Sequence, residues 1–233
     1  MKSIMEMIKR SFRQFYDHIF KLGGVSLLWF LIVAPLSYVG VVGLFLKMPI
    51  PFLINLVFVG PLTIGAFYMT NLVIKRREVT IKAFFKGFSD KKYFLKGMFS
   101  YWLSLFIAIV LGFDLIFFMN MTGVFKYITG LWIYLIIFFV VSQFYFWSLL
   151  VETEDGIFKS FKKSLLLVLD NPLYSLVLFL AFLLIMVVGV VTVGVGLAIT
   201  LIGITSIMAN NATYNLLVKY DLREEITTSY NND

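Results

Sequence analysis

The chain has 233 residues, of which 61% are hydrophobic and 18% aromatic, whereas ordinary soluble domains contain about 45–50% apolar residues. Only 14% of the residues are charged and the mean hydropathy is +0.94, so one water-soluble core of this size could not bury the apolar surface. The absence of Cys and the single His exclude thiolate nucleophiles, zinc–cysteine sites and His-based triads. The HExxH, GxSxG and Walker A motifs are also missing. We therefore predict a membrane protein that is not an enzyme and binds no cofactor.

Apolar segments of about 20 residues are long enough to cross a hydrocarbon core of about 30 Å as helices. Four segments without Lys or Arg meet this length, and a fifth, residues 173–210, is about twice as long. Glycines in its middle, Gly189, Gly194 and Gly196, favour two helices joined by a tight turn over one long tilted helix, which would fit the bilayer poorly. We predict one all-α membrane domain, residues 1–233, with six transmembrane helices arranged as three hairpins. The predicted spans are residues 22–46, 51–74, 98–118, 127–151, 173–189 and 193–210.

The positive charges favour the same topology. In the six-helix arrangement 18 of the 20 Lys and Arg residues fall on one side, and only Lys47 and Lys126 fall on the other. Because cytoplasmic loops carry an excess of Lys and Arg, both termini are predicted to lie in the cytoplasm. A five-helix arrangement would move Lys219 and Arg223 outside and weaken this asymmetry. The net charge of +7 thus indicates topology, and no nucleic acid partner is expected.

A short pattern recurs on the predicted cytoplasmic side: an Ile, a Phe four residues later, and then a basic residue. It begins at Ile8, Ile81 and Ile157, at separations of 73 and 76 residues, and reflects either duplication or chance in a chain rich in Phe and Lys. In each copy the apolar residues share one helical face, which predicts an amphipathic helix before each hairpin. These helices would contact anionic lipids or dock another protein. The candidate contact residues are Ile81, Phe84, Phe85, Lys86, Phe88, Lys75, Arg76 and Arg77.

One ionisable residue, Asp114, lies inside a predicted span, about 24 Å from its cytoplasmic end. This depth fits a hydrated acid near the outer boundary or a proton or cation site. Asn55 and Gln143 lie in other spans, where interhelical hydrogen bonds that fix packing are expected. Asn55 has a depth similar to that of Asp114, so a pair between the two is a further candidate.

Two prolines interrupt neighbouring predicted spans at matching depth. Pro35 lies 13 residues after Leu22, and Pro61, which follows Gly60, lies 13 residues before Ile74. Broken helices at matching depth occur in transporters, but a proline in a membrane helix is commonly only a bend. The small residues that follow Gly60 favour close helix packing, and we favour this structural interpretation.

An acidic group, Glu152, Glu154 and Asp155, follows the fourth predicted span on the same side as the basic run 75–77. Solvated loop charge or pairing with the basic run accounts for it. Metal binding by the three acids is the weaker hypothesis.

Three motifs follow one another between Gly60 and Gly97. They are a proline–threonine–small run in a helix (60–66), a basic exit with an acid (75–78) and a Phe-Phe-Lys-Gly-Phe helix (84–88). Over about 40 residues this segment resembles the YesL family of small bacterial integral membrane proteins. The resemblance implies a non-catalytic accessory subunit of a carbohydrate ABC importer in the bacterial cell membrane, with the permease subunits as partners. It implies no active-site residues.

Two functions of different classes are therefore compared. An accessory subunit would bind an importer's permease through helix faces and the basic cytoplasmic surface. An autonomous secondary transporter or channel would line a pathway with the Pro35 and Pro61 breaks and with Asp114. Because the central parts of the predicted spans are almost wholly Leu, Ile, Val and Phe, we favour the accessory subunit. Membrane lipids are the other expected partners.

Overall fold

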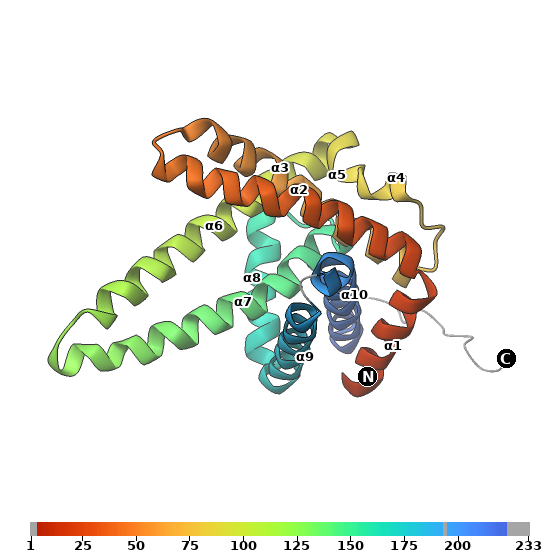
Figure 1. Ribbon diagram of the computed structural model, residues 1–233. Helices are drawn as coiled ribbons and strands as arrows, with labels where there is room; N and C mark the ends of the chain where they lie inside the picture. Colours follow the sequence, from red (N-terminus) through yellow and green to blue (C-terminus); the bar gives the residue numbers. More distant parts are fainter. Residues whose placement is uncertain (1–3, 193–194, 223–233) are drawn as a thin grey trace.

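The computed structural model describes residues 4–192 and 195–222, and this part of the chain is helical without a β-strand (Figure 1). An all-α fold is therefore confirmed. The elements are α1 (Ile4–Asp17), α2 (Ile19–Phe45), α3 (Pro49–Ile74), α4 (Ile81–Phe84), α5 (Lys86–Ser89), α6 (Lys91–Met119), the 3-10 helix η1 (Gly123–Ile128), α7 (Thr129–Glu152), α8 (Ile157–Asp170), α9 (Pro172–Val191) and α10 (Val195–Lys219).

Five of the described helices are long and apolar enough to cross a membrane: α2, α3, α6, α7 and α9. The first four coincide with the four predicted spans that lack Lys and Arg. Helix α6 begins seven residues before its predicted span because Asp90 caps it: the Asp90 carboxylate accepts a hydrogen bond of 2.9 Å from the backbone N–H of Lys92.

The long apolar stretch 173–210 forms two helices, as predicted. Helix α9 ends at Val191 and α10 begins at Val195, while Gly194, one of the glycines expected in the turn, lies outside the described residues. Figure 1 shows α9 and α10 nearly end-on where α2 and α3 lie across the view, so the three predicted hairpins do not share one direction. A sixth crossing by α10 and the three-hairpin topology stay predictions.

The core lies where α3, α7 and α10 meet, because each of these helices packs against the other two. Large side chains from all three are almost completely buried there, including Met69, Tyr145 and Ile207. Helix α10 also packs against α1, α2 and α9, and α3 also packs against α2, α4, α5 and α6, so these two helices are central to the described fold.

The predicted amphipathic helix at 81–88 is divided into two short helices, α4 and α5, which meet at Phe85. Phe84 is fully buried against the core, whereas Ile81 and Phe85 are exposed. Glycines explain this docking: a Cβ on Gly65 would overlap the carbonyl oxygen of Phe84. The segment therefore packs against the backbone of α3, and only part of its apolar face is left for lipid. The outer copies of the pattern form the amphipathic helices α1 and α8.

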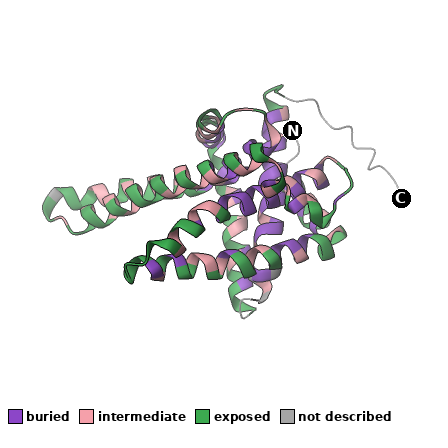
Figure 2. Cartoon of the chain, turned by 90° about the horizontal axis from the view of Figure 1, so that it is seen from above, coloured by how far each residue is buried: buried purple, intermediate pink, exposed green. Residues whose placement is uncertain are grey.

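Helices α6 and α7 form a hairpin whose far half, residues 106–140 including η1, projects from the rest of the molecule (Figure 1). We call this half the arm. Contacts between α6 and α7 include a hydrogen bond of 2.7 Å from Ser104 to Gln143, just outside the arm. Within the arm, the rings of Phe118 and Trp132 stack at 5.9 Å. Figure 2 shows that the arm is mostly exposed, in contrast to the buried centre of the fold.

Candidate functional site

A buried charge pair joins the ends of α3 and α7. The Nζ of Lys75 lies 3.2 Å from the Oε2 of Glu152, whose side chain is only 4% exposed. The amide of Asn71, one turn before Lys75, donates to the same carboxylate oxygen. Two donors therefore compensate the burial of the Glu152 charge. The expected pairing of the acidic group with the basic run is thus seen for this pair, while Arg76 and Arg77 are exposed.

Two adjacent asparagines of α10 bond to α3 and α1, one of them at Thr70, the residue before Asn71. Asn210 donates to the carbonyl oxygen of Phe67 over 3.0 Å and to the hydroxyl of Thr70 over 2.9 Å, both on α3. Asn211 donates to Ser11 of α1 over 3.0 Å. We call Asn71, Lys75, Glu152 and Asn210 the polar junction. Sequence reasoning missed both asparagines, although two adjacent amides in an apolar helix are a signal for interhelical bonding.

Asp155, another acid at this end, is held by bases of its own. Asp155 accepts from Lys159 over 2.7 Å and from Lys163. Because Asp155 and Glu152 each have their own cations, they do not converge on one point, and the residues that the structure describes contain no group of three His, Cys, Asp or Glu that could hold a metal ion. Hydrogen bonds from Lys159 and Lys163 lower the pKa of Asp155 to about 2.

This shift predicts a specific acid sensitivity. The pKa of Asp155 is lower in the folded chain than its usual value of 3.8, so its contribution to stability is present above about pH 4 and is lost as the pH falls towards 2. The thermal midpoint in detergent, measured between pH 5 and pH 2, should therefore fall less steeply for Asp155→Asn than for the unaltered chain. Lys162→Gln, which removes a lysine of α8 that does not contact Asp155, should keep the original slope. Equal slopes for Asp155→Asn and the unaltered chain would contradict the assignment.

The predicted interhelical bonds of Asn55 and Gln143 are seen, but the pairing of Asn55 with Asp114 is not. Asn55 donates to Ser37 of α2 over 3.1 Å and accepts from the hydroxyl of Tyr101 of α6 over 2.8 Å. The Asn55 amide thus connects α3 to α2 and α6 by hydrogen bonds. Sequence spacing predicted a depth for Asn55 but could not show which face of α3 it occupies.

Asp114 has a different environment. It is half-buried on the arm, five residues before the end of α6. It makes no hydrogen bond or ion pair with the residues that the structure describes. This carboxylate is therefore the one sequence-predicted polar residue of the spans that the described chain does not pair.

The expected breaks at Pro35 and Pro61 are absent, since α2 and α3 continue as helices through both residues. Instead, this region is a packing site. A Cβ on Gly60 would overlap the carbonyl oxygen of Gly97 in α6, and a Cβ on Gly87 would overlap that of Pro61. The small residues thus allow backbones to touch, as in other closely packed membrane helices.

The candidate contact residues of segment 81–88 have different environments. Phe88 packs against the ring of Phe58 at a centroid distance of 5.9 Å, and Lys86 pairs with Asp90 at 3.4 Å on the surface. Ile81 and Phe85 stay exposed. Part of the predicted contact surface is therefore occupied by the fold itself.

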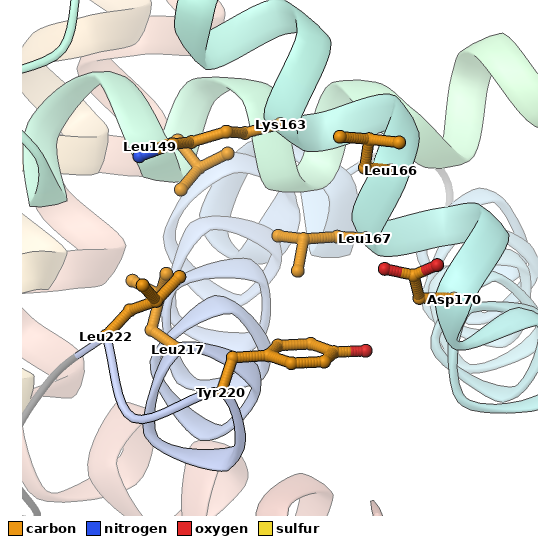
Figure 3. Close-up of a pocket in the computed structure, with 8 residues that line it drawn as sticks. All are labelled: Leu149, Lys163, Leu166, Leu167, Asp170, Leu217, Tyr220 and Leu222. Carbon is orange, nitrogen blue, oxygen red and sulfur yellow. The ribbon is translucent and has the colours of Figure 1, made fainter.

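A small cavity of about 220 Å³ lies between α7, α8 and the end of α10 (Figure 3). Its polar groups are few, and Lys163 is already bound to Asp155. The volume is below the roughly 300 Å³ at which small-molecule sites begin, and leucines supply most of the lining. An oligosaccharide would need more polar partners. The lining residues are Leu149, Lys163, Leu166, Leu167, Asp170, Leu217, Tyr220 and Leu222.

The fold and its polar contacts fit the class of all-α, multi-pass membrane proteins. The buried amides and hydroxyls described above form hydrogen bonds between its helices. No known family model, curated protein or solved structure matches this chain.

Proposed function

We propose that the chain is a non-catalytic accessory subunit of a carbohydrate ABC importer, embedded in the bacterial cell membrane with both termini in the cytoplasm. It supports or assembles the importer's permease. The observation that carries this proposal is the arm, a pair of apolar helices that leaves the body of the protein and exposes large side chains on several faces. Such a surface offers a second membrane protein extensive van der Waals contact.

The interior supports a structural role over a transport pathway. Asn55, Gln143 and the polar junction are engaged in contacts between helices, and Gly60 and Pro61 lie in a packed helix contact. A sugar pathway needs polar and aromatic groups that face a cavity, whereas these groups face neighbouring helices. The resemblance of residues 60–97 to YesL proteins points to the same role.

Purification tests the proposal. The chain is extracted in a mild detergent from membranes that also contain the permease subunits of a carbohydrate importer from the same cell. We expect stable recovery of those subunits, and loss of importer assembly when the chain is deleted. Recovery of the chain alone, together with sugar uptake by the purified chain in liposomes, would contradict the proposal and favour an autonomous transporter.

A further inference from the structure

The arm combines exposed apolar surface with a carboxylate that has no partner within the described chain. Phe106, Phe113 and Ile116 of α6 are each more than 60% exposed. Asp114 lies among them, half-buried and without a partner in the described ranges 4–192 and 195–222. A carboxylate at this position costs free energy unless a cation, a hydrogen-bond donor or water compensates it, and such residues mark functional contacts in membrane proteins.

A buried hydrogen-bond donor of the arm also lacks an acceptor within the described chain. The indole Nε1 of Trp132 is buried and has no acceptor among the described residues. Trp132 stacks on Phe118, which lies one helical turn after Asp114. An acceptor and a donor of the arm thus both lack a partner within the described chain, in a part of the molecule where α6 and α7 have few other neighbours (Figure 1).

We propose that the arm docks against a transmembrane helix of a second membrane protein, and that this helix supplies a Lys or Arg side chain that pairs with Asp114. This inference rests on the proposed function, in which the second protein is a permease subunit. Charge complementarity identifies the kind of partner: Asp114 is the only acidic residue in the sequence from 106 to 140, and the one basic residue there, Lys126, lies in η1.

A second copy of the chain fits this surface less well. Two identical arms related by an axis along the membrane normal would hold their Asp114 carboxylates at the same depth. Like charges that approach in a medium of low dielectric constant repel each other. A partner with a basic group at that depth removes this cost, and lipid tails cannot.

Photo-crosslinking tests the docking face. A benzophenone amino acid replaces either Phe113, which is 69% exposed and precedes Asp114, or Leu184 of α9, which is 66% exposed and serves as the matched control. Both variants are expressed with the permease subunits, and products are identified by mass spectrometry after irradiation of intact membranes. We expect the Phe113 variant to yield a permease adduct, and Asp114→Asn to reduce that adduct about fivefold or more while Asp114→Glu retains it. Elution of Asp114→Asn as a monodisperse, folded protein shows that the loss is not due to misfolding.

The outcomes separate this inference from the function on which it rests. An Asp114-dependent adduct with a different multi-pass membrane protein supports the docking arm and contradicts the importer assignment. A permease adduct from Leu184 but not from Phe113, or a Phe113 adduct that Asp114→Asn leaves unchanged, keeps the accessory function and overturns the inference. Adducts of Phe113 only with lipid or with a second copy also overturn it.

Discussion

Replacing Gly60 with leucine is expected to lower the free energy of unfolding by about 3 kcal/mol. The reason is steric: a Cβ at this position would overlap the carbonyl carbon and oxygen of Gly97, and these backbone atoms cannot move aside as the end of a flexible side chain can. Helices α3 and α6 would separate at the point where Tyr101 also binds Asn55. For a chain of this length we expect the thermal midpoint in detergent, followed by circular dichroism, to fall by about 6 to 12 °C.

Gly24→Leu is the matched control. Gly24 also lies inside a long helix, α2, but a Cβ there would meet nothing within 4 Å. We expect a change within about 0.5 kcal/mol. If the two leucine variants lose the same stability, the α3–α6 contact does not set the effect, and the packing site is misassigned.

Lys75→Met is expected to cost about 3 kcal/mol, because it removes the cation of a buried pair and leaves the Glu152 carboxylate with Asn71. Glu152→Gln should cost less, since Lys75 is 22% exposed and its ammonium can turn to water. The double variant Lys75→Met with Glu152→Leu should recover most of the stability, because no charge stays buried. Thermal unfolding of the unaltered chain, Lys75→Met, Glu152→Leu and the double variant forms a double-mutant cycle that isolates the pair.

Lys86→Met provides the control for this cycle. It breaks the exposed pair with Asp90, which is also lysine–carboxylate but lies on the surface, and should cost less than about 0.5 kcal/mol. A cost for Lys75→Met as small as that of the control would show that Glu152 is solvated and that the polar junction does not hold α3 to α7.

Hydropathy and charge predicted the parts of the fold that depend on a single segment. The four spans without Lys or Arg and the division of 173–210 follow from segment length and from glycines, which are local properties. The split of 81–88 into α4 and α5 could not be predicted, because it depends on the bare backbone of α3 at Gly65, which is distant in the sequence. Periodicity identifies an apolar face but does not tell whether lipid or another helix covers it.

The candidate site shows the same limit. The sequence predicted a depth for Asn55, Asp114 and Gln143, and Asn55 and Gln143 make the interhelical bonds that were expected. It did not show that Tyr101 rather than Asp114 binds Asn55, because the rotation of each helix about its axis is set by tertiary packing. The polar junction was only partly foreseen, since pairing of Glu152 with the basic run was one of several interpretations.

Cysteine labelling tests the membrane topology on which the whole account depends. The natural chain has no Cys, so single substitutions Lys126→Cys, at the tip of the arm, and Lys162→Cys, on α8, each introduce one thiol. An impermeant maleimide added to intact spheroplasts should label Lys126→Cys and leave Lys162→Cys unlabelled until the membrane is permeabilised. Equal labelling of both thiols before permeabilisation, or labelling of Lys162→Cys alone, would contradict the account.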